Sequence, residues 1–551
     1  MILGHMLLSN FNLLASAPGG VARLRELILT LAVQGKLVPQ DAADERATVL
    51  LERIRAEKDR LIEAGEIRRD KPLTEISEKE KPFELPESWA WVRLPQIYYS
   101  ISPSGSKLLS SAVQPEGMYP VVDQGQRPIA GYTNDQSLVI EIPGPVIVFG
   151  DHTKEIKYVD FDFVAGADGT KILRPIFQDA RFFACQLRSF KLEHRGYARH
   201  FKVLNSHLFA VPPLAEQSRI VTRVEELMHL CDALEAKGKL EAAQHAQLVS
   251  SLLATPTESR TPEALAANWQ RISQHFDLLL DRPEAVDALE QTILQLAVRG
   301  LLVPQNPQDE PASVLLQKIR ADKDRLIAEG KIRRDKPVEE ISEEEMPFEL
   351  PNQWAWGRFG DLVLVSSGIT LGRKTAIPTP ISLPYLRVAN VQRWHLNLNS
   401  MKDVVIDQSE LPRFKLQNGD LLITEGGDWD KVGRTTIWHE ELPVCLHQNH
   451  VFKARGTSPD WNPIWAELFL NSAFARTYFA SSAKQTTNLA SINMTQLKDC
   501  VFPLPPLSEQ SCIVTQVNTL RRLCADLRQR LAASQTTQGQ LAAALLEAPA
   551  A

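Results

Sequence analysis

The stretch ILTLAVQGKLVPQ at residues 28–40 returns as ILQLAVRGLLVPQ at residues 293–305. The match extends without a gap over residues 23–91 and 288–356, at an offset of 265, with 45 identities in 69 positions. Both copies continue through IRRDKP and end in PFELP-x-x-WAW. A period this long exceeds that of any solenoid repeat, so the sequence predicts a duplicated domain.

A second repeated block follows each copy. VPPLAEQSRIVTRVEELMHLCDAL at 211–234 matches LPPLSEQSCIVTQVNTLRRLCADL at 504–527, at an offset of 293. Because the offset has grown by 28, the inserts at about 92–210 and 357–503 differ in length, and they show no obvious similarity to each other. The chain therefore has two halves, each with a repeated frame around its own insert.

The second block has the spacing of an amphipathic helix. In both copies apolar residues recur at alternating intervals of four and three, which is the a/d seam of a coiled coil. The first seam is Ile220, Val224, Leu227, Cys231 and Leu234, and the second is Ile513, Val517, Leu520, Cys524, Leu527 and Leu531. We expect the first helix to run from about Glu216 to Leu253 and to end at Thr255–Pro256. Two matched seams favour antiparallel pairing with each other; the alternative is that each helix packs within a globular bundle.

The inserts have the pattern of compact α+β domains. Short β-rich runs such as PVIVFG (145–150) alternate with glycine and proline, and helical stretches follow at about 177–195 and 463–480. The predicted fold class is α+β: two globular α+β domains separated by a pair of long antiparallel coiled-coil helices, with internal pseudo-two-fold symmetry.

The expected segments follow from these patterns. They are 1–91 (helical and charged, first repeat copy), 92–210 (first insert domain), 211–255 (first coiled-coil helix), 256–356 (linker and second repeat copy), 357–503 (second insert domain) and 504–551 (second coiled-coil helix). Each repeat copy should hold a short helix and then a charged amphipathic helix, at 24–33 and 49–62 in the first copy and at 289–298 and 314–327 in the second.

Charge is divided unevenly between the frame and the inserts. The 551 residues carry 61 Lys+Arg and 67 Asp+Glu, a net charge of -6, which excludes a strongly basic chromatin-type protein. Residues 92–210 hold 13 basic and 11 acidic residues, and residues 357–503 hold 15 and 13, so each insert is +2 and the remainder is -10. The mildly basic inserts favour anion binding.

The cysteines and the hydropathy bear on location. None of the six cysteines forms a C-x-x-C pair, which is typical of reduced thiols in the cytosol. The sequence has no run of 18 apolar residues and no basic region ahead of its first apolar residues. We therefore expect a cytoplasmic protein with no membrane partner.

A basic segment stands near the end of the first insert. RFFACQLRSFKLEHRGYARHFK (181–202) interleaves cations with aromatic residues, a composition suited to contact with phosphates. The candidate cations are Arg188, Lys191, Arg195, Arg199 and Lys202. The alternative is an ordinary amphipathic helix with a solvated basic face and a phenylalanine core face.

Other polar stretches offer further candidates for nucleic-acid contact. VFGDHTK (148–154) and TEGGDWDKVGR (424–434) each place a turn after an apolar strand and present His152, Lys154, Lys431 and Arg434. KQTTNLASINMTQLK (484–498) is rich in amides and hydroxyls that can bind base edges and phosphates; its candidates are Gln485, Thr486, Asn488 and Asn493. The alternative for this stretch is a polar loop.

Catalytic signatures do not emerge from the sequence. GITLGRKT (368–375) resembles a phosphate-binding loop, but Arg373 occupies the position of the required glycine. Neither N-P-P-[YF] nor D-P-P-[YF], the usual adenine-methyltransferase motif, occurs, and the twelve histidines have no metal-ligand spacing. We therefore predict no catalytic residue, no metal site and no cofactor on this chain.

Together these features resemble the specificity subunit of type I restriction–modification enzymes. The resemblance rests on the two P-P-L-x-E-Q motifs at the ends of dissimilar inserts, the heptad helices after them, and the repeated A-V-x-G-x-L-V-P-Q and P-F-E-L-P-x-x-W-A-W segments. YLRVANVQ (385–392) resembles part of a target recognition domain, which adds Arg387, Asn390 and Gln392 as DNA-contact candidates.

The resemblance implies a division of labour. Each insert would read one half of a split site in double-stranded DNA, and the frame would set the gap and dock two methylation subunits that methylate adenine N6 with S-adenosylmethionine. Two restriction subunits using ATP and Mg would join for cleavage. Helix pairing and subunit docking would fall on Pro213, Leu214, Glu216, Gln217, Ile220, Val224, Leu227, Leu234, Pro506, Leu507, Glu509, Gln510, Ile513, Val517, Leu520 and Leu527.

Three points stay open on the sequence alone. A stand-alone endonuclease with an unrecognised site and a non-enzymatic scaffold with two protein-binding heads are the alternative functions. The duplicated charged segments 41–86 and 306–351 depart from the simplest family pattern, and docking to other subunits is one interpretation of them. The bases that are read do not follow from the residues.

Overall fold

The computed structural model describes most of the chain. The described residues are 17–69, 72–102, 107–166, 169–192, 199–259, 261–334, 340–372, 377–427, 431–486 and 489–547. They form two compact units, unit 1 (residues 1–242 and 534–551) and unit 2 (residues 243–533). Each unit contains one insert domain and one repeat copy.

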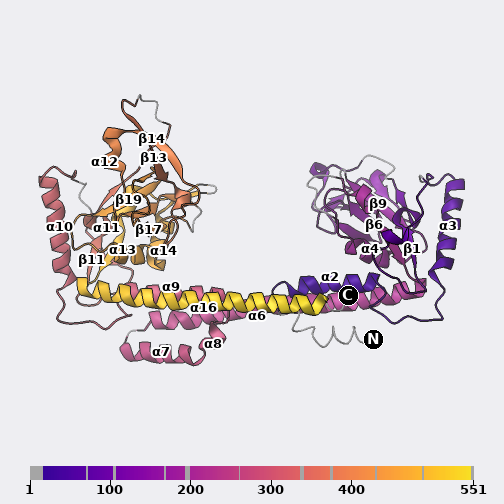
Figure 1. The fold of residues 1–551 in the computed structure, drawn as a ribbon, viewed down its shortest axis with the longest axis horizontal. Coiled ribbons are helices and arrows are strands. Elements are labelled where there is room, and N and C mark those ends of the chain that lie inside the picture. The colour runs from indigo at the N-terminus through magenta and orange to yellow at the C-terminus, as the bar shows by residue number, and fades with distance from the viewer. Residues whose placement is uncertain are drawn as a thin grey trace. The chain divides into compact units, whose positions relative to one another are not determined.

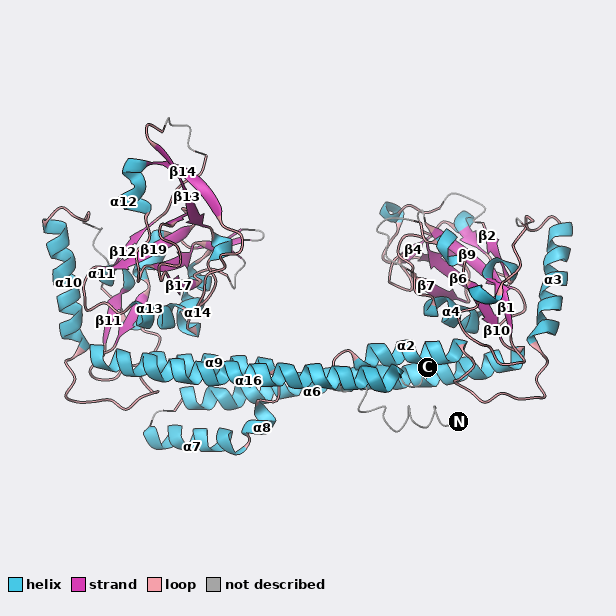
Figure 2. Ribbon diagram, in the orientation of Figure 1, coloured by secondary structure: helices cyan, strands magenta, loops and turns pink. Residues whose placement is uncertain are grey.

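Unit 1 begins with the frame helices expected from the repeat. Helix α2 (Gly20–Val33) buries Leu24, Leu27, Ile28 and Leu31 against the start of helix α6 (Leu214–Thr257), and the two run side by side (Figure 1). Helix α3 (Ala47–Glu63) stands at the edge of the unit (Figure 2). Its apolar face packs into the same core, which makes this charged helix part of the unit rather than a solvated arm.

The described residues of the first insert domain form three sheets. Strands β1 (Ala90–Arg93) and β10 (Leu208–Val211) pair at its base. The main antiparallel sheet has the order β2-β9-β6-β7 and a second sheet has the order β4-β3-β8-β5. The bounds are β2 Tyr98–Ile101, β3 Tyr119–Val122, β4 Gly131–Thr133, β5 Val139–Ile140, β6 Val146–Gly150, β7 Ile156–Val159, β8 Phe163–Ala165 and β9 Thr170–Pro175, with helices α4 Ala180–Ser189 and α5 Phe201–Leu204.

Unit 2 repeats the frame. Helix α9 (Pro283–Val298) packs along helix α16 (Leu507–Glu547), and α10 (Ala312–Ala328) corresponds to α3. Between α6 and α9 the chain forms helices α7 (Pro262–Gln274) and α8 (Phe276–Leu279), which occupy the expected linker. Pro262 and Pro283 stand in the first turns of α7 and α9, where a missing N–H costs no helical hydrogen bond.

The second insert domain has the same main sheet as the first. Its order is β12-β19-β15-β17, and β13 pairs antiparallel with β14 and parallel with β18, as β3 does with β4 and β8. A small sheet, β16-β21-β20, is added, and β11-β22 closes the base. The bounds are β11 Ala355–Arg358, β12 Val363–Ser366, β13 Pro380–Leu386, β14 Lys402–Asp407, β15 Leu421–Thr424, β16 Gly426–Gly427, β17 Thr435–Ile437, β18 Leu446–His447, β19 Val451–Gly456, β20 Lys484–Thr486, β21 Leu489–Ser491 and β22 Val501–Leu504, with helices α11 Phe359–Leu362, α12 Leu411–Phe414, α13 Pro463–Leu470, α14 Ala473–Ser482 and α15 Met494–Asp499.

Three predicted helix boundaries need correction. Helix α6 ends at Thr257 with Pro256 inside its last turn, and not before the proline. In the described part of the predicted stretch 177–195, residues 177–192, the helix covers Ala180–Ser189; the Ser189 hydroxyl donates to the carbonyl of Gln186 and competes with helix continuation. The stretch 463–480 is two helices, because Ser472 caps α14 by accepting from the backbone N–H of Ala475.

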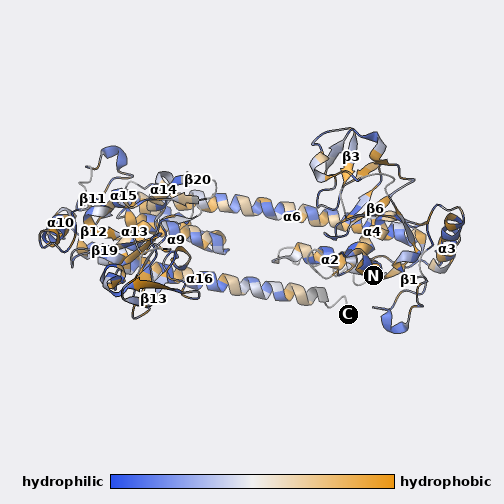
Figure 3. Cartoon of the chain, turned by 90° about the horizontal axis from the view of Figure 1, so that it is seen from above, coloured by the Kyte–Doolittle hydropathy of each residue, from blue (hydrophilic) through white to orange (hydrophobic). Residues whose placement is uncertain are grey.

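The long helices contribute to both cores. In unit 1 the core includes Ala542 near the end of α16, and Arg23 of α2 donates to the carbonyl of Gly539. In unit 2 the core includes Val249 and Leu253 near the end of α6. Hydrophilic and hydrophobic residues alternate along α6 (Figure 3), as the heptad pattern predicts. The pairing of the two seams with each other stays a prediction.

The duplicated charged segments are tied to their own insert domains. Arg93 at the end of β1 donates to the carbonyls of Thr74 and Glu75 and pairs with Glu80 at 2.9 Å. In the other copy Arg358 pairs with Glu345 at 2.7 Å. Hydrogen bonds from Ser77 and then Arg93 lower the pKa of Glu80 to about 2, and hydrogen bonds from Arg358 and then Ser342 lower the pKa of Glu345 to about 2. These segments therefore connect the frame to the base of each insert domain through hydrogen bonds and ion pairs.

Candidate nucleic-acid interface

Loops that follow the central strands gather at one end of the main sheet in the first insert domain. The turn after β6 carries His152 and Lys154. The backbone N–H of His152 donates to the side-chain oxygen of Gln124 at 3.3 Å, and the Thr153 hydroxyl donates to the carbonyl of Gln124 at 2.5 Å. Lys154 has a left-handed backbone, with φ 65°, and its ammonium donates to the carbonyl of Leu192. Gln124, which sequence reasoning missed, therefore holds this turn in place.

The basic segment reaches the same turn. The backbone N–H of Phe201, the first residue of α5, donates to the carboxylate of Asp151 at 2.8 Å, and the N–H of His200 donates to the carbonyl of Asp151 at 2.9 Å. Asp151 thus fixes α5 beside the turn after β6. As a result the exposed side chains of Arg199 and Lys202 lie on segments anchored next to His152 and Lys154.

The rest of the segment is divided between core and surface. Phe182 and Phe183 are fully buried in α4, so the predicted phenylalanine core face is confirmed. Arg188 is exposed, and its guanidinium donates to the carbonyl of Ile156 at 3.1 Å; Lys191 is exposed just after α4. Arg195 lies outside the described residues. The segment is therefore not one continuous basic helix.

The second insert domain gathers its polar loops at the corresponding end of its sheet. Arg434, in the turn between β15 and β17, donates to the side-chain oxygen of Gln392 at 2.6 Å, which joins two predicted residues that are far apart in sequence. The Thr424 hydroxyl donates to the carbonyl of Lys431 and accepts from the N–H of Arg434. The strand end at Thr424 therefore positions both Lys431 and Arg434.

A histidine–carboxylate pair, missed from the sequence, lies beside these residues. His450, in the turn before β19, is 2.6 Å from the carboxylate of Glu425, and the N–H of Glu425 donates to the carbonyl of His450. The His450 side chain is 54% exposed, so it stays accessible to a ligand. Their position in the sequence could have indicated this pair, because both residues stand at the ends of apolar strands.

Three predicted contact residues bond within the fold, and burial contradicts the prediction for Asn390, whereas DNA contact by Arg387 and Asn493 stays a prediction. Asn390 is 1% exposed, and its amide caps a tight turn by accepting from the N–H of Arg387 and donating to the carbonyl of Asn397. Asn493 is the N-cap of α15 and accepts from the N–H of Gln496. Arg387 donates to the carbonyl of Ser400. Short polar side chains next to turns are recruited as caps, a competing role that the sequence pattern does not separate from base contact.

The remaining predicted residues of this domain fall in its β20–β21 region. Gln485 and Thr486 belong to strand β20, which pairs with β21, and β21 in turn pairs with β16 directly after Glu425. The hairpin therefore joins the same loop cluster. Asn488 lies outside the described residues.

The P-P-L-x-E-Q motif forms a buried junction inside each unit. In unit 1 the carboxylate of Glu216 accepts from the indole N–H of Trp89 at 2.9 Å and from the amide of Gln40 at 2.6 Å. In unit 2 the carboxylate of Glu509 accepts from Trp354 at 3.0 Å and from Gln305 at 2.7 Å. We call each set the Gln–Trp–Glu junction. It joins the three repeated motifs that lie far apart in the sequence.

The glycine of A-V-x-G-x-L-V-P-Q is required by this junction. Gly35 and Gly300 have φ of 70° and 71°, and a Cβ on either would lie 2.6 Å from the ring of Pro86 or Pro351. Burial raises the pKa of both Glu216 and Glu509, while the hydrogen bonds from tryptophan and glutamine oppose that shift. A buried carboxylate with two fixed donors is a rigid connection between helix and domain.

These contacts correct the predicted docking role of the motif. Glu216, Gln217, Glu509 and Gln510 are at most 3% exposed. The Gln217 amide accepts from the N–H of Asp179 and donates to the carbonyl of Pro212, and that of Gln510 donates to the carbonyl of Pro505. Pro213 and Pro506 are buried beside them. The side chains hold the helix start to its own domain and are not available to another subunit.

The first part of each seam packs within its unit. Ile220, Val224 and Leu227 join the core with α2, and Leu234 packs against it. Ile513 and Val517 join the core of unit 2, with Leu520 and Leu527 packed on it. The bundle alternative therefore holds for these turns. By contrast Leu214, Leu230, Leu507 and Leu523 are exposed, and they occupy equivalent positions in the two copies.

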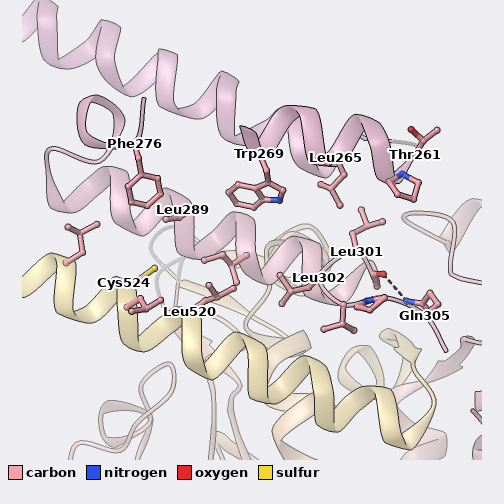
Figure 4. Close-up of a pocket in the computed structure, with 18 residues that line it drawn as sticks. Thr261, Leu265, Trp269, Phe276, Leu289, Leu301, Leu302, Gln305, Leu520 and Cys524 are labelled. Atoms are coloured by element: carbon pink, nitrogen blue, oxygen red, sulfur yellow. Dashed lines mark hydrogen bonds between the residues drawn. The ribbon is translucent and has the colours of Figure 1, made fainter. Parts of the chain in front are cut away.

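Unit 2 also has an apolar groove of about 1110 Å³ between α7, α8, α9 and α16. Trp269 and Phe276 project into it from α7 and α8, opposite Leu289 and Leu520 (Figure 4). Its lining residues include no lysine or arginine, so it lacks the charge to bind a phosphate backbone.

Further properties concern the described residues alone. They include no group of three or more His, Cys, Asp or Glu side chains arranged to hold a metal ion. None of their helices is long and apolar enough to cross a membrane. The six cysteines are unpaired, and burial raises the pKa of Cys185 to about 11 and of Cys445 to about 12, so these thiols are unreactive at neutral pH.

Comparison with known proteins agrees with this architecture. The chain is 34% identical over 561 residues to the type I restriction enzyme EcoEI specificity subunit of Escherichia coli, covering 96% of this chain and 94% of the relative. It is 36% identical over 564 residues to the EcoAI specificity subunit of the same organism, with the same coverage. The chain belongs to the family of type I restriction enzyme specificity subunits.

Solved structures with similar folds share little sequence with this chain. The HsdS subunit of Thermoanaerobacter tengcongensis aligns with 85% of this chain and 98% of its own length, at 17% identity and a TM-score of 0.36. A chain from the assembled type I R-M system aligns over the same shares at 17% identity and a TM-score of 0.47. No family model matches the sequence.

Proposed function

We propose that this specificity subunit reads a bipartite site in double-stranded DNA, with one insert domain on each half. The observation that carries the proposal is the shared sheet order of two domains with unrelated sequences, each with its polar and cationic loops at the same end of the sheet. In the first domain these are the turn after β6 and the start of α5. In the second they are the turns after β13 and β15, and the turn before β19.

The chemistry of these loops suits base and phosphate contact. Lysine and arginine neutralise phosphates, as Arg199, Lys202 and Lys431 would. Arginine can bind guanine and glutamine can bind adenine through two hydrogen bonds each, so Arg434 and Gln392 are the best-placed pair to read a base edge in the second half-site. His450 would contact a neighbouring phosphate or base, and the carboxylate of Glu425 would accept from a cytosine amino group.

Catalysis would lie on partner subunits. Two methylation subunits with S-adenosylmethionine would dock on the long helices, where the repeated exposed leucines (Leu214, Leu230, Leu507 and Leu523) offer equivalent apolar contacts. Two restriction subunits would bring ATP and Mg for cleavage. The chain itself would carry no cofactor and no catalytic group, and a complex that acts on DNA in the cell would be cytoplasmic.

Methylome sequencing tests the proposal. Cells that express this chain with its methylation subunit should methylate adenines in one bipartite sequence, and replacing residues 92–210 with the first insert of a relative should change only one half. A control chain without the methylation subunit should leave the DNA unmodified. Absence of any bipartite methylated sequence, or a change in both halves after the replacement, would contradict it.

A further inference from the structure

A tryptophan in the second insert domain stacks on an arginine of the frame. The guanidinium carbon of Arg521, on α16, lies 3.9 Å from the centroid of the Trp394 ring. A cation this close to an indole face is strongly attracted to it, and partial burial increases the attraction. Trp394 stands two residues after Gln392, the residue that accepts from Arg434, so the stack is adjacent to the candidate base-reading pair.

The backbone at Trp394 is held in an unusual conformation. Its φ is 70°, a region that bulky side chains rarely adopt, and its N–H donates to the carbonyl of Thr435 at 3.3 Å. The preceding Arg393 donates to the side chain of Asn471, which in turn bonds both the N–H and the carbonyl of Thr435. The loop is therefore fixed from both sides, by β17 and by α16.

Arg521 is itself oriented by the frame. Its guanidinium bonds the carboxylate of Glu290 on α9 at 2.7 Å, and Glu290 also accepts from Arg528. Glu467 of α13 adds a second carboxylate near Arg521 from the domain side. The contacts make a continuous path from α9 through α16 to the loop that carries Gln392.

The described residues of the first half have no equivalent stack on α6. At an offset of 293, Met228 takes the position of Arg521 and packs as an apolar residue against the core of unit 1. The ion pair itself is present in unit 1 with its charges exchanged, because Arg25 of α2 bonds Asp232 and Glu235 of α6. The arginine–tryptophan contact is thus an addition to the second half and not a requirement of the duplicated frame.

We propose that Trp394 and Arg521 are positioning residues that set the orientation of the Gln392 loop and thereby the base selectivity of the second half-site. This inference rests on the proposed function. Neither residue is assigned a contact with DNA. Loss of the stack frees the loop to take other orientations, so Gln392 and Arg434 no longer meet one base edge in a single geometry.

The test compares Arg521→Met with Arg528→Met in the full chain, expressed with its methylation subunit. Arg521→Met installs the residue that the first half carries at the same position. Arg528→Met removes a neighbouring bond to the same Glu290 but does not touch Trp394, so it is the matched control. Methylome sequencing then measures methylation at cognate sites and at sites with one mismatch in either half; the insert replacement described above identifies which half belongs to residues 357–503.

We expect Arg521→Met to reduce discrimination against second-half mismatches about 3- to 30-fold, from the strength of a partly buried cation–π contact. Discrimination in the first half should stay unchanged, and Arg528→Met should leave both halves unchanged. Trp394→Leu should reproduce the Arg521→Met profile and Trp394→Phe should largely restore selectivity, which tests the contact independently if Arg521→Met does not fold.

Two results would overturn the inference. One is equal relaxation of both half-sites in Arg521→Met, which a general loss of stability would produce. The other is a profile for Arg521→Met and Trp394→Leu that matches Arg528→Met. Failure of the wild-type chain to direct methylation to any bipartite sequence would instead contradict the proposed function itself.

Discussion

Replacing Trp89 with phenylalanine is expected to destabilise unit 1 alone. The substitution keeps an aromatic ring in the core but removes the N–H that donates to Glu216. Because Glu216 is 0% exposed, water cannot replace the lost donor. A hydrogen bond to a charged group contributes about 1.5–3 kcal/mol, and the smaller ring leaves a gap, so the free energy of unfolding of unit 1 should fall by about 2–4 kcal/mol.

Hydrogen exchange followed by mass spectrometry resolves the two units. Amides at the start of α6 should lose at least about 30-fold in protection, since each 1.4 kcal/mol corresponds to about a factor of ten. Amides at the start of α16 should not change. Trp354→Phe should give the reverse pattern, because Trp354 bonds Glu509 in unit 2.

The matched control is Trp91→Phe, which makes the same substitution two residues away on a half-buried ring that packs edge-on against Phe83. It should change protection less than threefold. If Trp89→Phe and Trp91→Phe had equal effects, or if Trp89→Phe weakened both units alike, the junction would not be the local connection that its geometry indicates.

Three further predictions address charge, binding and spacing. Burial raises the pKa of Glu467 to about 7, above its ordinary value of 4.5, so its contribution to stability is complete below pH 4.5 and is lost as the pH rises to 7. The free energy of unfolding, measured by urea titration, should therefore fall between pH 5 and pH 7.5, and Glu467→Gln should remove about 2 kcal/mol of that fall. An unchanged pH dependence in Glu467→Gln would contradict the burial argument. Arg199→Ala and Lys202→Ala should each lower the slope of log affinity against log salt by about one in DNA-binding titrations, whereas Arg223→Ala on α6 should not; unchanged slopes would return both residues to a solvated surface. Inserting four residues after Leu234 lengthens α6 by about 6 Å and should lengthen the unread gap by one to two base pairs without changing the bases read; an active variant with an unchanged gap, seen in its methylome, would show that this helix does not set the spacing.

The frame was the most predictable part of the fold because its signals are local. The helices α2, α3, α9 and α10 appear where the repeat places them, within six residues at the start and one at the end. Their apolar periodicity and flanking turns are determined by neighbouring residues. The strand order that the two inserts share could not be predicted from their sequences. A sheet requires apolar residues at certain positions, but many different apolar residues can occupy each of them.

The candidate site was predicted less well than the frame. The pairing of Arg434 with Gln392 joins residues 42 apart in sequence, and the anchoring of α5 by Asp151 joins residues 50 apart. Polar loop residues have no periodicity that would indicate such partners. Asn390 is predicted to contact DNA because amides can read bases, but its buried amide satisfies neighbouring backbone groups instead.

Comparison of the two frame copies separates what the junction requires from what the surface tolerates. Gln40, Trp89 and Glu216 recur unchanged as Gln305, Trp354 and Glu509, because a buried acceptor needs donors of fixed kind and reach. The nearby ion pair has its charges exchanged between the copies. In unit 1 Arg25 of α2 pairs with Glu235 of α6, and at the equivalent positions in unit 2 Glu290 of α9 pairs with Arg528 of α16.

A Coulombic attraction depends on the product of the two charges, so exchanging both signs preserves it while changing one would not. The two halves therefore keep the same attraction with the signs of both partners exchanged. The partners lie 210 residues apart in unit 1 and 238 apart in unit 2, and the matched inversion agrees with the packing of α2 on α6 and of α9 on α16.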